Sequence, residues 1–340
     1  MSTAIVILNW NGENFIRQFL PVLIENTTMP GVEIIIADNA STDSSLMLLN
    51  EKFPSIRTIA FDKNYGFAGG YNKAFEQIEA DYFILLNSDV EVTPHWLEPL
   101  LTYMDAHQEV AACQPKILSY DQRTRFEHAG AAGGYIDRFG FPYCRGRIVG
   151  YAEKDSNQYD SIADIFWATG ACLIIRSDIY RQAGGLDDEF FAHMEEIDLC
   201  WRLKSRGYRI VCNPESSVFH VGGGALGYES PHKIYLNFRN NLLMLYKNLS
   251  AGLLRKTMFW RSVFDYSAAI KYILTGKFDY AKSIFKARRD FLTMRPDFEE
   301  KRKQNILLST TDLKSEIFQG SIVLEYYLKG KKTFSSIVSK

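Results

Sequence analysis

Three short apolar runs of the sequence end at polar residues that could bind a ligand. Asn9, Asp38 and Asp89 stand at or just beyond the ends of these runs. The runs are rich in isoleucine, valine and leucine, which is typical of buried strands. Because ligands of open α/β sheets bind outside the carboxyl ends of the strands, we expect the three side chains to line one crevice.

A glycine-rich segment at 64–72 leads into a predicted helix. Glycines let the backbone approach a phosphate or a sugar, and a helix N-terminus favours negative charge. The spacing differs from G-x-G-x-x-G and no Walker lysine follows, which argues against NAD-binding and P-loop sites. The alternative interpretation is that Gly66, Gly69 and Gly70 serve only a tight turn.

Three acidic residues fall within four positions at the start of another predicted helix, Glu195, Glu196 and Asp198. Neighbouring carboxylates raise one another's pKa values, which suits a general base. Acidic side chains in a first helical turn also favour the helix dipole, so a purely structural role stays open.

His220 follows an apolar segment and precedes the glycines at 222–224. A lone histidine is more often structural than ligating. The position before a glycine run nevertheless makes His220 a candidate metal ligand.

These residues require an α/β scaffold. Apolar runs at 3–8, 32–37, 56–61 and 82–86 alternate with amphipathic segments, which predicts a mostly parallel sheet covered by helices on both faces. Ser41 or Thr42 is a candidate helix cap. Further strands are expected at 171–175 and 208–213, a helix at 195–205, and loops with short strands at 119–165. From Pro231 to about Arg295 the pattern is helical.

The composition excludes several classes of protein. The chain has 340 residues, of which 46% are hydrophobic and 23% are charged, so it is neither disordered nor collagen-like. No run approaches the ~20 apolar residues that span a bilayer, and we expect no signal peptide. The five cysteines are scattered and form no CxxC pair, which favours free thiols in a reducing cytosol.

The charge is unevenly distributed. Residues 1–250 hold 21 Lys/Arg and 31 Asp/Glu, a balance of −10, whereas residues 251–340 hold 18 and 9, a balance of +9. Basic residues among aromatic ones in this tail fit an interfacial membrane helix. A solvated helical face is the plainer alternative, and the absence of a nucleic-acid motif argues against nucleic acid as a partner.

Taken together, these segments resemble the inverting family 2 glycosyltransferases, which have a GT-A fold. The resemblance covers about residues 3–250 and continues more weakly to about 300. Within the family the chain looks most like rhamnosyltransferase-like enzymes of surface polysaccharide synthesis. The resemblance depends on the blocks at 7–11, 37–43, 64–72, 86–89, 184–187 and 195–198.

The resemblance assigns roles to these residues. It implies a divalent metal, Mg²⁺ or Mn²⁺, held by Asp89 and His220, although Asn87 replaces the first aspartate of the family's DxD motif. It implies Glu196 as the base, with Asp198 as a rival, and acceptor contacts from Trp167, Gly170 and Glu195. Contacts to the donor nucleotide are implied for Asn9, Asn11, Asp38, Asn39, Gly66, Gly69, Asn72, Ser88 and Asp89.

We therefore expect a GT-A catalytic domain at 1–230 and a helical, basic region at 231–340. The catalytic domain divides into a nucleotide-sugar half at 1–118 and an acceptor half at 119–230. The expected reaction moves a sugar, with rhamnose as one candidate, from a UDP- or dTDP-sugar to a polysaccharide or lipid-linked saccharide. The expected location is cytoplasmic, at the inner face of the cell membrane. Two alternatives stay open: a sugar-nucleotide nucleotidyltransferase, and a sugar-nucleotide-binding protein without catalysis.

Overall fold

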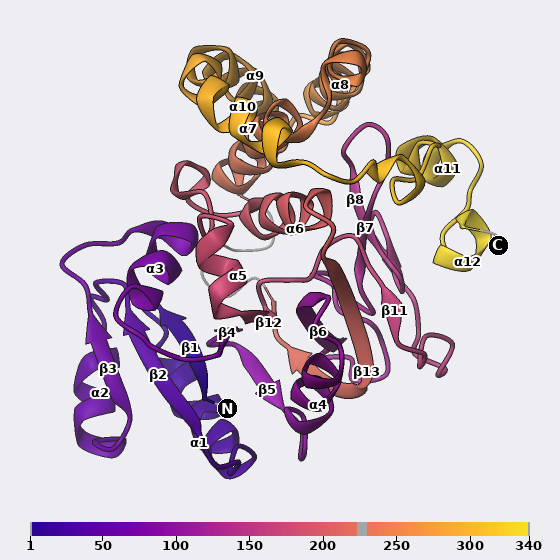
Figure 1. Cartoon of the computed structure of the whole chain (residues 1–340). Helices are drawn as coiled ribbons and strands as arrows, with labels where there is room; N and C mark the ends of the chain where they lie inside the picture. The colour runs from indigo at the N-terminus through magenta and orange to yellow at the C-terminus, as the bar shows by residue number, and fades with distance from the viewer. Residues whose placement is uncertain (1, 223–229, 339–340) are drawn as a thin grey trace.

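A nine-stranded sheet forms the centre of the molecule, with helices on both faces (Figure 1). The computed structural model describes residues 2–222 and 230–338. The strands of this sheet are β1 (Thr3–Asn9), β2 (Val32–Asp38), β3 (Arg57–Ala60), β4 (Tyr82–Asn87), β5 (Val90–Val92), β6 (Val110–Ser119), β11 (Ala163–Asp164), β12 (Cys172–Arg176) and β13 (Arg209–His220). Their order is β11-β13-β6-β12-β4-β1-β2-β3, and β5 pairs with β13.

The N-terminal half of the sheet is parallel, as the alternation of strands and helices predicts. β1 pairs with β2 and β4, and the register sets Asn9 beside Asp38 and Leu8 beside Asn87. Alternate residues of each strand enter two separate apolar cores, so Ile5 packs on one face and Val6 on the other. The parallel register therefore brings three strand ends to one edge of the sheet.

Helices from both halves of the chain cover this sheet. One face packs against α1 (Glu13–Glu25), α2 (Ser45–Lys52) and α4 (Glu98–Ala106). The other face packs against α3 (Gly66–Phe75), α5 (Ser177–Gln182) and α6 (Glu195–Ser205). The helix predicted at 195–205 is thus confirmed at both ends.

Helix α2 begins differently from the prediction. Its N-cap is Ser44, so Ser41 and Thr42 are not its caps. The carboxylate of Asp43 instead accepts hydrogen bonds from the Ser45 and Glu13 backbone amides, each at 3.0 Å. Asp43 thereby ties the starts of α1 and α2 together.

The second half of the sheet contains antiparallel pairings. β12 runs antiparallel to both β4 and β6. β13 continues to His220, well beyond the predicted end at residue 213, because its pairing with β6 resumes at Ser217 after an irregularity and extends to His220. The segment at 119–165 folds as the predicted loops and short strands, of which β7 (Gly134–Ile136), β8 (Pro142–Cys144), β9 (Arg147–Ile148) and β10 (Tyr151–Ala152) form a second sheet.

The described elements from Pro231 onward are helices, and several of them cluster at one end of the molecule (Figure 1). In the described part of the chain no helix is long and apolar enough to cross a bilayer. All five cysteines are free and buried. The helical segments are α7 (Pro231–Asn248), α8 (Ala251–Leu274), α9 (Phe278–Met294), η2 (Arg295–Phe298), α10 (Glu299–Leu308), η3 (Leu313–Ser315), α11 (Ile322–Tyr327) and α12 (Phe334–Ile337).

Candidate functional site

Asn9 and Asp38 meet at the carboxyl ends of β1 and β2. The Asn9 amide Nδ2 donates to Asp38 Oδ2 at 2.9 Å, and the Ser41 backbone amide donates to Asp38 Oδ1, also at 2.9 Å. Both side chains are fully buried. The Asn9 Oδ1 atom is buried and has no hydrogen-bond partner among the described residues. Such an orphaned acceptor is expected where a ligand completes the site.

Asn11 and Asn39 shape the loops beside this pair. Asn11 has a φ of +52°, and its Oδ1 accepts from the Thr42 backbone amide at 2.7 Å. Asn39 Nδ2 donates to the Gly66 carbonyl at 2.9 Å, and its Oδ1 accepts from the Tyr65 amide at 2.9 Å. The structure therefore gives both asparagines a role in building the edge of the site.

The glycine-rich segment is closely packed at the start of α3. Gly66 has a φ of +73°, and a Cβ there would lie 2.5 Å from the Phe191 ring, so only glycine fits. A Cβ on Gly69 would lie 3.2 Å from Tyr65. Asn72 Oδ1 accepts from the Tyr180 hydroxyl at 2.6 Å, and Asn72 Nδ2 donates to the Leu186 carbonyl at 2.8 Å. Asn72 thus joins α3 to the second half of the chain.

Asp89 and His220, predicted as metal ligands, are in direct contact. His220 Nε2 lies 3.1 Å from Asp89 Oδ1, and Nδ1 lies 3.3 Å from Glu127 Oε2. Burial alone would lower the pKa of His220, but the two carboxylates outweigh it and raise the pKa to about 10. Burial acts on Glu127 in the opposite direction and is outweighed by His220, so the pKa of Glu127 is lowered.

The donor set at this point fits a divalent cation. A carboxylate and an imidazole suit Mn²⁺ or Mg²⁺ when substrate phosphates supply the other ligands. A carboxylate on the far nitrogen of a ligating histidine is the usual partner that orients the ring. Glu127 occupies that position, and the predictions from sequence did not include it. The part of the chain that the structure describes contains no cluster of three or more metal-binding side chains.

Glu195 and Glu196 lie in the first turn of α6, after a strained turn. Burial raises the pKa of Glu195 well above its ordinary value, and the charge of Glu196 adds to this effect. Burial likewise raises the pKa of Glu196 to about 7. Both Oε2 atoms are buried without a hydrogen-bond partner in the described structure. Met194, just before them, has a φ of +75°, a strain of order 1–3 kcal/mol.

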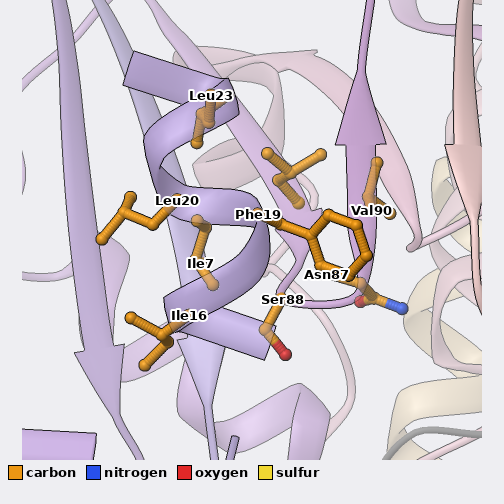
Figure 2. Close-up of a pocket in the computed structure, with 9 residues that line it drawn as sticks. Ile7, Ile16, Phe19, Leu20, Leu23, Asn87, Ser88 and Val90 are labelled. Carbon is orange, nitrogen blue, oxygen red and sulfur yellow. The ribbon is translucent and has the colours of Figure 1, made fainter. Parts of the chain in front are cut away.

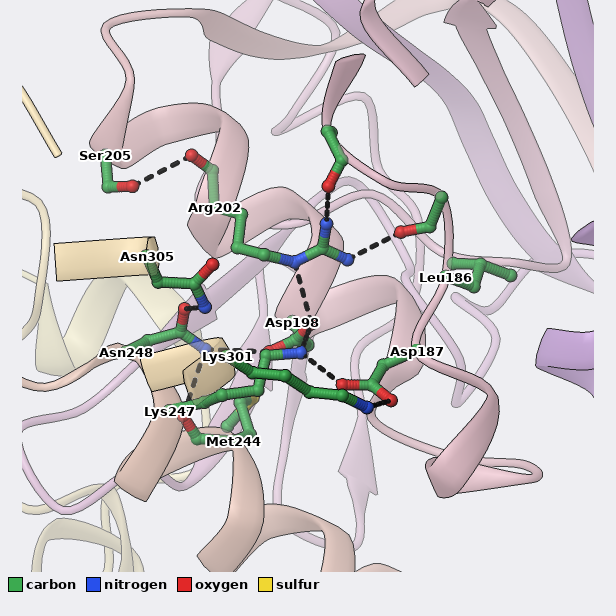
Figure 3. A network of polar contacts seen from close by, with 12 residues as sticks. Leu186, Asp187, Asp198, Arg202, Ser205, Met244, Lys247, Asn248, Lys301 and Asn305 are labelled. Atoms are coloured by element: carbon green, nitrogen blue, oxygen red, sulfur yellow. Dashed lines mark hydrogen bonds and ion pairs between the residues drawn. The ribbon is translucent and has the colours of Figure 1, made fainter. Parts of the chain in front are cut away.

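Asp198 lies on the same helix in a different environment (Figure 3). Its Oδ2 accepts from Arg202 Nε at 2.9 Å and from Lys247 Nζ at 2.8 Å. Its Oδ1 accepts from Asn248 Nδ2 at 2.7 Å. Lys247 also contacts Asp187 at 2.6 Å. Asp198 is completely buried in this network, and both of its carboxylate oxygens accept hydrogen bonds, which hold the side chain in place.

The predicted acceptor residues Trp167 and Gly170 lie on a tightly packed loop. Trp167 is buried, and its indole N–H donates to the Tyr135 carbonyl at 2.9 Å. A Cβ on Gly170 would lie 2.8 Å from the Phe67 ring. The next carbonyl, that of Ala171, accepts from the Asn87 amide at 3.0 Å. This loop therefore contacts both the start of α3 and the turn that carries Asp89.

Backbone hydrogen bonds also connect α3 with the acidic turn. The Phe67 backbone amide, at the start of α3, donates to the Phe191 carbonyl at 2.6 Å. Phe191 precedes Glu195 and Glu196 by four and five residues. The glycine-rich helix start, the Asp89 turn, the 167–171 loop and the acidic turn thus form one continuous structure. A helix N-terminus can stabilise an anion, and a carboxyl with a raised pKa can accept a proton, so the arrangement suits group transfer from an anionic donor.

Comparison with known proteins decides the family. Residues 4–180 match the family described as "Glycosyl transferase family 2". The chain belongs to this family. It is a glycosyltransferase, with the GT-A fold that the sequence predicts.

Two curated relatives show what this glycosyltransferase resembles. It is 23% identical to the N-acetylglucosaminyl-diphospho-decaprenol L-rhamnosyltransferase of Mycobacterium tuberculosis, over 89% of the chain and 96% of the relative. It is 27% identical to the O-antigen biosynthesis protein RfbC of Myxococcus xanthus, over 61% of the chain. That match spans only 16% of the much longer relative.

Solved structures share its fold at low sequence identity. The S. aureus TarS 1-349 structure in complex with UDP-GlcNAc aligns with a TM-score of 0.58 and 15% identity. That alignment covers 97% of this chain and 93% of the TarS chain. GalNAc-T7 with UDP, GalNAc and Mn²⁺ aligns with a TM-score of 0.56 and 14% identity, over 73% of this chain and 48% of that one.

A small apolar cavity in the glycosyltransferase borders the turn that carries Asp89. It is lined by Ile16, Phe19 and Leu20 of α1 together with Asn87 and Ser88 (Figure 2). Its volume of about 10 Å³ is roughly that of one water molecule. The Ser88 side chain borders this cavity, while its neighbour Asp89 contacts His220.

Proposed function

We propose that this glycosyltransferase is a metal-dependent inverting enzyme that uses a UDP- or dTDP-sugar as donor, with rhamnose as the first sugar to test. The observation that carries the proposal is the Glu196 carboxyl. It lies in the first turn of α6, which follows the turn whose Phe191 carbonyl accepts from the start of α3. It has a pKa of about 7 and an oxygen without a partner among the described residues. A base that titrates near the working pH transfers a proton most efficiently.

The donor would bind at the strand ends. Each Asp38 oxygen accepts one hydrogen bond and has a second lone pair for the imide N–H of uracil or thymine. Asn9 Oδ1 is a further free acceptor. Asn11, Asn39 and Asn72 would act through the backbone that they hold, with Gly66 and Gly69 letting that backbone approach the sugar diphosphate.

Asp89 and His220 would hold the divalent ion against the diphosphate. When bound, the ion neutralises the charge that develops on the diphosphate leaving group. Glu127 orients the His220 ring from its other nitrogen. Ser88 lies between Asn87 and Asp89, where its backbone fixes the turn that presents Asp89.

The acid pair would divide the work of catalysis. Burial and the charge of Glu196 raise the pKa of Glu195, which favours the protonated form of that residue, and Glu196 would accept the proton of an acceptor hydroxyl. The hydroxyl oxygen then attacks the anomeric carbon as the bond to the diphosphate breaks, in one displacement. Asp198 holds α6 in place through Arg202 and Lys247. Trp167 and Gly170 would shape the loop on which the acceptor rests.

A lipid-linked or polymeric saccharide is the proposed acceptor. The names of both curated relatives support this choice, since one acts on a decaprenyl diphosphate sugar and the other serves O-antigen biosynthesis. An acceptor with a polyprenyl chain would place the enzyme at a membrane surface. The helices α8 and α9 offer a suitable surface.

The proposed membrane surface consists of two apolar stripes with basic neighbours. On α8 the stripe includes Phe259, which is 63% exposed, and Leu274, which is 81% exposed. On α9 the side chains of Phe278, Phe285 and Leu292 recur every seventh residue and are exposed. The Tyr266 and Phe285 rings, 5.9 Å apart, join the two stripes. The basic side chains of Lys256, Lys282 and Arg289 are exposed next to them.

This charge and shape favour an anionic bilayer as the partner. Apolar side chains insert at the headgroup level while lysine and arginine pair with anionic lipids. Sedimentation with vesicles of phosphatidylcholine, with and without phosphatidylglycerol, tests the surface. We expect binding only with the anionic lipid and its loss in Phe259→Ser. Leu307→Ser, on the exposed part of α10, is the control that should bind normally. Self-association without vesicle binding would instead assign the surface to a second copy.

Donor binding and transfer test the reaction itself. Thermal shifts with UDP-, dTDP-, GDP- and CMP-sugars, with and without Mn²⁺, should show metal-dependent stabilisation by one pyrimidine diphosphate sugar. Transfer from that donor to N-acetylglucosaminyl diphosphate on a short prenyl chain should yield a product with inverted anomeric configuration. Folded protein that shows no shift with any donor would contradict the proposal. Donor binding without any turnover would favour a binding protein instead.

A further inference from the structure

The turn that precedes the two glutamates is held in an unusual conformation. Phe191, His193 and Met194 have φ angles of +63°, +71° and +75°, a backbone region that residues other than glycine rarely adopt. Three such residues within four positions persist only when their surroundings over-determine them. The groups that hold this turn therefore control the direction in which α6 begins.

Two adjacent residues of α7 hold this turn. The Asn240 amide Nδ2 lies 2.9 Å from the Phe190 carbonyl and 2.8 Å from the carbonyls of Ala192 and His193. Asn240 is completely buried. Only an N–H donor is compatible with three carbonyl oxygens around one atom.

Arg239 completes the arrangement. Its Nη2 donates to the carbonyls of Glu189 at 3.0 Å and Phe190 at 3.1 Å. Its Nε donates to Asn240 Oδ1 at 2.9 Å, which fixes the orientation of the amide. A planar guanidinium can make these contacts together because its donors diverge in a rigid fork.

The turn connects the proposed donor and base sites. The Phe191 carbonyl accepts from the Phe67 and Ala68 amides at the start of α3, at 2.6 and 3.2 Å. The Met194 carbonyl accepts from the Asp198 amide at 2.9 Å and so forms the first hydrogen bond of α6. One strained segment thus sets both helix starts, with Arg239 and Asn240 behind it.

We propose that Arg239 and Asn240 are positioning residues for the transfer step, which hold the turn at 189–194 so that Glu196 faces the donor bound at α3. This inference rests on the proposed function. It adds that the alignment of base and donor depends on a pair of side chains in the C-terminal helical region. Neither side chain needs to touch substrate.

Kinetics of four variants test the inference, with transfer to the prenyl diphosphate saccharide as the readout. Asn240→Asp replaces the N–H donor of the amide by a carboxylate oxygen, and Arg239→Ala removes the guanidinium. Both should lower kcat at least tenfold, while the donor concentration for half-maximal thermal shift changes less than threefold. Added guanidinium should restore part of the kcat of Arg239→Ala. Arg239→Lys should keep an intermediate kcat.

Asn237→Ala is the matched control, because among the described residues the Asn237 side chain donates to the Lys233 carbonyl of its own helix, at 2.8 Å. Its kcat should equal that of the wild type. If Asn240→Asp fails to fold, guanidinium rescue of Arg239→Ala decides alone. Folded Arg239 and Asn240 variants with wild-type kcat would overturn the inference, as would a kcat loss in Arg239→Ala that guanidinium leaves unchanged. A wild-type enzyme without transfer activity would instead overturn the proposed function, before any variant is compared.

Discussion

The acidic side chains in the first turn of α6 lie in two different electrostatic environments. On one side, burial raises the pKa values of Glu195 and Glu196, and neither forms an ion pair with a residue that the structure describes. On the other side, Asp198 accepts from Arg202, Lys247 and Asn248. Acids within four positions of the sequence thus have opposite environments. The environment, and not the residue type, separates a proton acceptor from a structural anion.

The largest expected effect on stability comes from neutralising Asp198. Asp198→Asn keeps the shape of the side chain but leaves Arg202 and Lys247 with less negative charge in a buried network. Breaking a buried ion pair from one side costs about 3–5 kcal/mol of unfolding free energy. Urea unfolding at pH 7 measures it. Glu13→Gln, which removes an exposed pair with Arg17, is the control and should cost less than about 0.5 kcal/mol.

Removing the charge of Glu196 is expected to increase the unfolding free energy, whereas removing that of Asp198 decreases it. The folded-state pKa of about 7 lies above the ordinary value of 4.5, so the ionised carboxylate destabilises the fold as the pH rises above 4.5. Glu196→Gln removes that penalty and should stabilise the protein by about 3 kcal/mol at pH 8. The gain should vanish near pH 4. A loss of stability at pH 8 would show that the carboxylate has a cationic partner.

A smaller effect is expected from Asp187, which belongs to the Asp198 network. Burial opposes its ionisation, but Lys247 and Lys301 outweigh burial and lower its pKa to about 2. A depressed pKa contributes stability above the ordinary value of 3.8 that is lost as the pH falls through 2, about 2 kcal/mol in all. The stability difference between wild type and Asp187→Asn should therefore shrink between pH 4 and pH 2. A difference that stays constant over this range would contradict the assignment.

Local pattern was enough to predict the sheet and the acidic helix start. Apolar runs of four to eight residues have the length of strands, and the parallel register then fixed which polar ends meet. The same reasoning could not find Glu127, because it lies in an aperiodic segment and reaches His220 only through the fold. The strand that ends at His220 was also predicted too short, since its pairing with β6 is a tertiary interaction.

The sequence also could not show that Asp198 has cationic partners while Glu196 lies in a different environment. Lys247 and Asn248 lie about fifty residues from Asp198, and Arg202 lies one turn along the helix. Only the fold shows which acid these groups surround. The Arg239–Asn240 pair lies in a helical segment far along the chain from the strained turn, so only the structure shows that the two are hydrogen-bonded.

The pH dependence of transfer by the wild type and by Glu196→Gln tests the central claim most directly. With saturating donor, Mn²⁺ and the prenyl diphosphate acceptor, wild-type kcat should rise with pH through an apparent pKa near 7 and then level off. Glu196→Gln should bind the donor normally and lose about 10²–10⁴-fold in kcat. A Glu196→Gln enzyme that keeps wild-type kcat with the same pH profile would show that another group accepts the proton.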